Sequence, residues 1–229
     1  MPSKNKQIMK PHLILCEGID AVHFMIAMLG ELEQKTITNS FQALDFGGNE
    51  NLPAFLKGLP VLPGYNNVKS IVIVRDAETN HASAIQSVKS ALKNNGFSVP
   101  VSVNCVSQGD GVEHIGKHTV LTAFSLFPTL SHETDDGTLE HLILNNLREP
   151  SAYEALNDID EFLKILVNKE GSFTWPHKTR LHTYFSITNK FVAMKVGEAV
   201  KAGVFNFRCE EIKNFTFLLT QIYNASENT

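Results

Sequence analysis

Several features that define particular classes of protein are scarce in this sequence. Its 229 residues include 3 cysteines and 1 tryptophan, and no apolar run approaches the roughly 18–20 residues that a membrane helix needs. The cysteines, Cys16, Cys105 and Cys209, are far apart and odd in number, which argues against a cysteine-paired metal centre and a disulfide framework. Cys16 and Cys105 lie in apolar strand-like runs, so we expect both to be buried. A reducing cytoplasm fits this cysteine usage, and we expect no membrane contact.

The charge balance and the missing motifs exclude further classes. The formal net charge is −4, so the chain is not a strongly basic nucleic-acid coat, although local basic patches or bound cations could attract phosphates. The sequence has no Gly-x-Ser-x-Gly elbow of a serine hydrolase and no Gly-Lys-Ser/Thr of a nucleotide-binding loop. His177 and His182 lack the four-residue spacing of paired zinc ligands. His114 and His118 have that spacing, but Gly116 lies between them, so we expect loop histidines.

Strand and helix patterns alternate along the first part of the chain. The β-branched run at residues 71–74 is typical of a strand that is buried on both faces of a parallel sheet. This alternation predicts an α/β fold, in which a parallel sheet is flanked by helices on both faces. The predicted strands are residues 12–16, 41–46, 69–75, 99–106 and 120–127, and the predicted helices are 20–32, 49–56 and 82–94.

From residue 131 the pattern becomes mostly helical. An acidic loop at 132–137 precedes predicted helices at 138–147, 151–167, 177–194 and 210–223. We expect the polar first twelve residues to fray and residues 225–229 to form a loose tail. The chain is therefore predicted to be a single domain over 1–229, with a core over about 11–148 and a helical C-terminal extension over about 151–225.

Acidic residues follow the predicted strands directly. Glu17 ends the first strand, Asp76 and Glu78 follow the central strand, and Asp136 and Glu140 lie at a later helix start. The ends of parallel strands meet at one edge of a sheet, where these carboxylates would repel one another unless cations lie among them. Oxygen-rich clusters of this kind bind Mg²⁺ or Mn²⁺, and two such ions can hold both oxygens of a phosphodiester displacement. The alternative for any single acid is a helix cap or a solvated loop residue, which we favour for Asp45, Asp110 and Asp135.

These residues carry a family resemblance. The segment Ile14-Leu15-Cys16-Glu17-Gly18-Ile19-Asp20 resembles the first motif of Toprim domains, and Asp76-Ala77-Glu78 resembles their second, normally Asp-x-Asp. Within Toprim, the chain is most similar to small stand-alone, uncharacterised Toprim-like proteins related to the nuclease domain of the OLD family. The segment Gly137-Thr138-Leu139-Glu140 and the basic helix His177-Lys178-Thr179-Arg180 are similar to later motifs of that group. The resemblance spans residues 13–217.

The resemblance implies a compact Toprim-like sheet, Mg²⁺ (or Mn²⁺) as cofactor, and hydrolysis of nucleic-acid phosphodiesters, DNA or RNA, in a defence or repair system. Carried over by position, Glu17, Asp76 and Glu78 would be metal ligands, and Asp136 or Glu140 would complete the site. Lys178, with Arg180 behind it, would stabilise charge that develops on the phosphate. A solvated helix residue is an equally open role for Lys178. Glu17, Asp76 and Lys178 are thus the candidate catalytic residues.

Some positions depart from the pattern and leave alternatives open. Glu78 stands where an Asp is usual, and Ala21 stands where close relatives carry a second Asp. The alternative function is a non-catalytic Mg²⁺-binding module for a nucleotide, nucleic acid or partner protein. A partner ATPase is plausible by analogy with OLD systems, and a homodimer stays open. A nuclease requires Lys178 to face the acids, whereas a binding module does not. Phe173 and Trp175 could stack on a single strand, or Trp175 could be a packing anchor.

Overall fold

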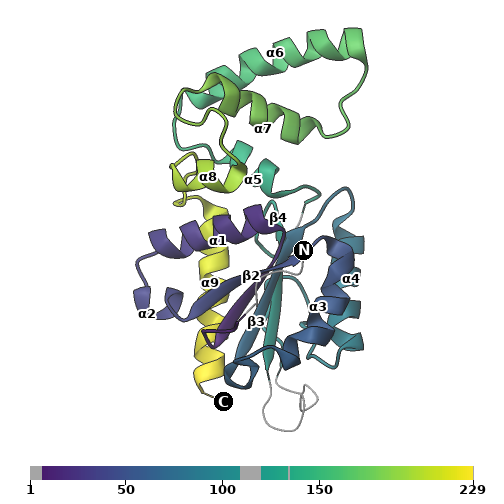
Figure 1. Ribbon diagram of the computed structural model, residues 1–229, viewed down its shortest axis with the longest axis vertical. Helices are drawn as coiled ribbons and strands as arrows, with labels where there is room; N and C mark the ends of the chain where they lie inside the picture. Colours follow the sequence, from purple (N-terminus) through teal and green to yellow (C-terminus); the bar gives the residue numbers. More distant parts are fainter. Residues whose placement is uncertain (1–6, 109–119, 134, 229) are drawn as a thin grey trace.

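The computed structural model describes residues 7–108, 120–133 and 135–228. Asp110, His114 and His118 lie outside the described residues, as do the first six residues of the predicted frayed end. Within the described ranges the chain forms a parallel sheet flanked by helices, as the sequence predicts (Figure 1). In the same ranges, no helix is both long enough and apolar enough to cross a membrane.

The sheet has four parallel strands in the order β2-β1-β3-β4. Strands β1 and β3 occupy the centre, with Cys16 opposite Val74, and β4 pairs with β3 so that Phe127 lies opposite Asp76. All four strands therefore end at the same edge, where Glu17 and Asp76 are the last residues of the two central strands. The strands are β1 His12–Glu17, β2 Phe41–Gly47, β3 Ser70–Asp76 and β4 Leu121–Phe127.

Apolar side chains on both faces of the central strands explain why helices cover both faces. In β3, Val72 and Val74 belong to one core cluster, whereas Ile71 and Ile73 belong to the other. This division follows from the two-residue alternation of a strand. Helices α1 and α9 cover the first face, and α3 and α4 cover the second (Figure 1). The helices that follow β1, β2 and β3 are α1 Ile19–Glu31, α2 Lys35–Thr38, α3 Leu52–Gly58 and α4 His81–Asn94, with short 3₁₀ turns at Asn49–Asn51, Leu59–Val61 and Tyr65–Asn67.

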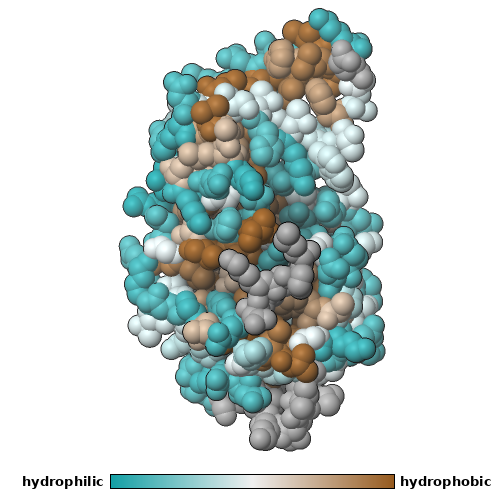
Figure 2. All heavy atoms as spheres, in the orientation of Figure 1, coloured by the Kyte–Doolittle hydropathy of each residue, from teal (hydrophilic) through white to brown (hydrophobic). Residues whose placement is uncertain are grey.

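The C-terminal helices divide between the sheet and a projecting hairpin. Helix α9 returns along the sheet, whereas α6 and α7 lie beyond the end of the molecule that carries α5 (Figure 1). Helix α8 packs against α1, and the backbone N–H of Gly197 donates to the Asp20 carboxylate at 3.0 Å. Figure 2 shows apolar side chains on the surface of the hairpin, where Phe162 and Ile165 are exposed. These helices are α5 Leu139–Asn145, α6 Ala152–Glu170, α7 Pro176–Ile187, α8 Val196–Lys201 and α9 Glu210–Glu227.

The strand predicted at 99–106 is wrong. This segment is irregular, and the backbone hydrogen bonds that join it and the adjacent Ser107 to β4 are isolated ones, from Asn104 N–H to the Phe124 carbonyl and from Ser107 N–H to the Thr122 carbonyl. Pro100 has no N–H to donate, and Asn104 adopts a left-handed backbone with φ of 55°, so the segment cannot form a regular ladder. Cys105 is consequently half-buried rather than part of the core, whereas Cys16 is buried as predicted.

The predicted helix ends also need correction near the C-terminus. Helix α7 ends at Ile187 rather than at 194, and the separate helix α8 follows, which the sequence analysis missed. Helix α9 continues to Glu227, so most of the predicted loose tail is helical. The carboxylate of Glu227 lies 2.9 Å from Lys69 Nζ, which fastens this end of the helix to the start of β3.

Phe24 joins the sheet to the C-terminal part of the chain and provides a test of the core. Its buried ring lies 5.9 Å from that of Phe127, 5.0 Å from Phe205 and 5.6 Å from Phe207. We predict that Phe24→Ala lowers the unfolding free energy by about 3–5 kcal/mol, because the cavity it leaves cannot close fully. Ile26→Ala, on the exposed face of the same helix, should cost no more than about 0.5–1 kcal/mol. Denaturant unfolding measures both, and equal losses would contradict the packing described.

Candidate functional site

Glu17 is positioned by the turn that ends β1. The following residue, Gly18, has φ of 83°, a conformation that favours glycine, although a side chain there would meet no neighbouring atom. Asp45 fixes this turn, since its carboxylate accepts hydrogen bonds from the N–H groups of Gly18 (3.1 Å) and Gly47 (2.7 Å). The backbone geometry thus favours the glycine of the Glu-Gly pair. Asp45 therefore has a structural role, but it lies in strand β2 and is not the helix cap or solvated loop residue that the sequence favoured.

Arg75 supplies a buried positive charge beside Glu17 that the sequence analysis missed. Its Nε lies 3.5 Å from Glu17 Oε2, and its side chain also donates to the Asp76 carbonyl and to the Ser87 hydroxyl. Burial raises the pKa of Glu17, and the charge of Arg75 opposes that rise. The available signal was a single arginine in an otherwise apolar strand, directly before an acid.

Asp76 lies at the centre of the acidic group. One of its carboxylate oxygens accepts a hydrogen bond of 2.9 Å from the backbone N–H of Leu139, at the start of α5. Burial, followed by the nearby charges of Glu140 and Glu17, raises the pKa of Asp76 to about 8. Carboxylates that are distant in the sequence therefore act on one another here, and Asp76 holds a proton at neutral pH when no cation compensates them.

Glu78 is held in an uncommon backbone conformation next to this group. Its φ is 58°, in the left-handed region, and its N–H donates to the Gly137 carbonyl at 2.8 Å. Its charge contributes to the raised pKa of both Glu17 and Asp76. A non-glycine residue in this region costs free energy and is kept where the surroundings impose it, often at functional sites.

Glu140 and Lys178 face each other across the start of two helices. Glu140, in the first turn of α5, accepts a 2.7 Å hydrogen bond from the Thr138 hydroxyl. Lys178 reaches from α7 and places Nζ 3.7 Å from the other carboxylate oxygen of Glu140. Lys178 is half exposed, whereas Glu140 is largely buried. The lysine that the resemblance selects is therefore directed toward the acids.

Asp136 has a different set of contacts. Its carboxylate accepts a hydrogen bond from the His81 backbone N–H at 2.8 Å and lies 2.9 Å from His81 Nδ1. These hydrogen bonds at the start of α4 lower the pKa of Asp136. Its side chain is 52% exposed, so of the two alternatives for completing the site, Glu140 is the one that acts on Asp76.

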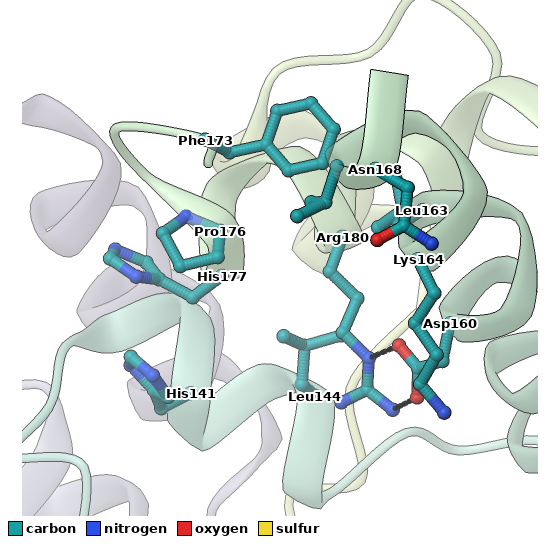
Figure 3. A pocket seen from close by; sticks show the side chains of 11 residues that line it. His141, Leu144, Asp160, Leu163, Lys164, Asn168, Phe173, Pro176, His177 and Arg180 are labelled. Carbon is teal, nitrogen blue, oxygen red and sulfur yellow. Dashed lines mark hydrogen bonds and ion pairs between the residues drawn. The ribbon is translucent and has the colours of Figure 1, made fainter. Parts of the chain in front are cut away.

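Two cavities lie next to the acidic group and share a wall made of His141, Pro176 and His177. The smaller cavity, of about 380 Å³, is lined by Glu78, Asp136, Thr138 and Trp175 besides this wall. The larger cavity, of about 690 Å³, lies between α5, α6 and α7 (Figure 3).

The two histidines of this wall were missed by the sequence analysis. Their rings stack at 4.5 Å, and His141 Nδ1 accepts a hydrogen bond from the Thr138 N–H. Burial and the neighbouring His177 lower the pKa of His141, so the His141 ring is neutral around pH 7. Arg180 lies beyond the wall and makes two 2.7 Å hydrogen bonds to Asp160. It therefore pairs with α6 and not with the acids (Figure 3).

The donor set suits a hard divalent cation. Glu17, Asp76, Glu78 and Glu140 offer only carboxylate oxygens, the ligands that Mg²⁺ and Mn²⁺ prefer. Among the residues that the structure describes, no three Cys, His, Asp or Glu side chains already stand in a metal-binding arrangement. Glutamate side chains have the rotamer freedom to close on an ion, and the raised pKa of Asp76 shows that added positive charge would be favoured there.

The fold and this edge define a class of protein: a four-stranded parallel α/β domain with interacting carboxylates at the ends of its central strands. The chain belongs to the family described as "Protein of unknown function (DUF3226)", whose model matches residues 11–224. A search of curated proteins finds no match.

The solved structures that match this chain include C-terminal regions of OLD proteins. That of Burkholderia pseudomallei OLD is 14% identical, covers 96% of this chain and 100% of its own, and has a TM-score of 0.49. That of Xanthomonas campestris pv. campestris OLD is 15% identical, covers 96% of this chain and 97% of its own, and has a TM-score of 0.43. Identities this low do not say which chemistry a chain performs.

The raised pKa of Asp76 predicts how stability depends on pH. Its pKa is about 8 in the folded chain and about 3.9 in the unfolded chain, so the folded state binds the extra proton between these values. Its contribution to stability is present below about pH 4 and is lost as pH rises to about 8. Asp76→Asn keeps an oxygen that can accept the hydrogen bond from the Leu139 N–H, but it has no carboxyl group to titrate. The free energy of unfolding of Asp76→Asn should therefore rise relative to that of the parent as the pH increases from about 5 to about 8.

Denaturant unfolding without divalent ions measures this difference. The control is Glu161→Gln on α6, which removes an exposed carboxylate away from the acidic edge. Its difference from the parent should stay constant between about pH 5 and pH 8. A constant difference for Asp76→Asn would show that neighbouring charges do not act on Asp76.

Proposed function

We propose that this protein is a Toprim-type hydrolase of nucleic-acid phosphodiesters that depends on Mg²⁺ or Mn²⁺. Three features support the proposal: the resemblance of the Glu17 and Asp76-x-Glu78 segments to Toprim motifs, the interaction of the carboxylates at one sheet edge, and a lysine that faces them. The third is the observation that carries most weight. A module that only binds a cation has no need of a basic side chain beside its acids, whereas a phosphodiesterase does.

Each residue of the site would have a distinct role in this hydrolysis. Glu17, Asp76, Glu78 and Glu140 would hold the divalent cation, which would supply the charge neutralisation that attack on a phosphodiester requires. Lys178 would stabilise negative charge that develops on the phosphate, since its Nζ lies 3.7 Å from Glu140. Arg75 would keep Glu17 in position from the buried side. Asp136 would fix the start of α4 against the loop before α5.

One observation favours the non-catalytic alternative. Arg75 already compensates Glu17 from within the chain, so part of the acidic charge is balanced without any cation. A binding module could use the remaining acids for one Mg²⁺ and a nucleotide or partner. Loss of activity on removing Lys178, with metal binding intact, separates the two functions.

We predict Mg²⁺- or Mn²⁺-dependent cleavage of plasmid or single-stranded nucleic acid by the parent. Glu17→Gln and Asp76→Asn should lower the rate at least about 100-fold, because each removes a charged oxygen that holds the cation. Lys178→Ala should lower it about 100-fold while metal affinity changes little. Gel assays measure the rates, and calorimetry measures the binding of the metal.

Two exposed residues serve as matched controls for these variants. Glu161→Gln on α6 and Lys93→Ala on α4 remove the same charges far from the acids and should cut as the parent does. If the parent binds the metal but does not cleave nucleic acid, the result would favour the non-catalytic binding module over the hydrolase. Cutting that survives in both Glu17→Gln and Asp76→Asn would place the chemistry elsewhere.

A further inference from the structure

Trp175 stands exposed on the wall of the smaller cavity. It is the only tryptophan of the chain, and the residue is 54% exposed to solvent. Glu78 and Thr138 line the same cavity, so the indole lies beside the acidic group. The larger cavity is lined by Phe173, Pro176 and His177 but not by Trp175 (Figure 3). The exposure is not that of a packing anchor, which buries most of its ring.

The start of α7 holds Trp175 in place through its backbone. The Trp175 carbonyl accepts hydrogen bonds from the Thr179 N–H at 3.0 Å and from the Thr179 hydroxyl at 3.1 Å. Pro176 follows and disfavours a helical backbone at Trp175, whose φ is −132° and ψ is 75°. The large aromatic face is therefore presented to solvent from a fixed point, and little order would be lost when a ligand covers it.

The ammonium group of Lys178 lies between the indole ring of Trp175 and the acids. Lys178 Nζ is 5.5 Å from the centre of the indole ring and 3.7 Å from Glu140 Oε1. The His177 ring adds an edge-on contact to the indole, with ring centres 6.2 Å apart. An aromatic face next to a lysine is the combination with which proteins bind unpaired nucleotides, the base on the ring and the phosphate on the cation.

We propose that Trp175 stacks on an unpaired base of a nucleic-acid strand whose neighbouring phosphate lies at Lys178. This inference rests on the proposed function and specifies its substrate as single-stranded or locally unpaired nucleic acid. In a duplex both faces of each base are covered by neighbouring bases, so the indole has no partner until a base leaves the stack. The smaller cavity, at about 380 Å³, falls in the size range of sites that enclose small ligands.

The single tryptophan permits a direct test, because intrinsic fluorescence reports Trp175 alone. The parent is titrated in Ca²⁺ with an oligothymidylate of ~15 nucleotides and with a blunt duplex of equal length, and gels verify that both stay intact. We expect saturable quenching by the single strand, with a Kd at least about tenfold lower than for the duplex.

Three variants are compared by anisotropy of the labelled single strand. Trp175→Ala should raise the Kd about tenfold or more, and Trp175→Phe should stay within about threefold of the parent because it keeps an aromatic face. Phe162→Ala is the matched control, since Phe162 is an equally exposed aromatic (53%) on α6 outside both cavities, and it should bind as the parent does.

Failure of this inference differs from failure of the proposed hydrolysis. Binding of the oligonucleotide without quenching, equal Kd values for single strand and duplex, an unchanged Kd in Trp175→Ala, or no binding at all would each overturn the stacking role. If Trp175→Ala does not affect metal-dependent cleavage of the plasmid, the proposed hydrolase activity would be retained and the stacking role of Trp175 rejected. Quenching and loss of affinity in Trp175→Ala, with no cutting under any divalent ion, would retain the stacking site and remove the hydrolase.

Discussion

Mutual repulsion among carboxylates at one edge of the sheet is the constraint on which the rest of this site depends. Parallel strands must end together, and here the two central strands end in Glu17 and Asp76, with Glu78 and Glu140 close behind. Low exposure strengthens the repulsion, and the pKa of Asp76 rises to about 8. The folded chain therefore binds a proton at a position where a divalent cation would serve the same purpose and bring more positive charge.

The surrounding structure keeps these acids together despite their repulsion. The Leu139 N–H at the start of α5 holds Asp76, the Gly18 turn directs Glu17, and the left-handed backbone of Glu78 is fastened to Gly137. Arg75 balances Glu17 from inside the protein, and Lys178 approaches Glu140 from outside. Because these restraints come from separate elements, the protein itself organises the edge, although no three Cys, His, Asp or Glu side chains among the described residues stand in a metal-binding arrangement.

The fold and most of the acidic edge could be predicted from the sequence, because both are set by local patterns. Apolar runs fix the strands, and a carboxylate directly after a run in a parallel sheet must lie at the shared edge. The features that the sequence did not predict correctly depend on contacts between residues that are far apart in the sequence. Residues 99–106 are apolar enough for a strand, but Pro100 and the left-handed Asn104 prevent a ladder. The pairing of Asp136 with His81, the stack of His141 on His177, and the exposure of Trp175 depend on how α4, α5 and α7 pack, which no local pattern encodes.

We propose that a divalent cation takes the place of the proton on Asp76. Calorimetric titration of Mg²⁺ into the protein, in two buffers of different ionisation enthalpy, counts the protons released on binding. With a pKa of about 8 for Asp76, binding at about pH 7 should release about one proton, and binding at about pH 9.5 should release almost none. Asp76→Asn should release about one fewer than the parent at the lower pH. Binding without proton release at about pH 7, or release that persists in Asp76→Asn, would contradict the account.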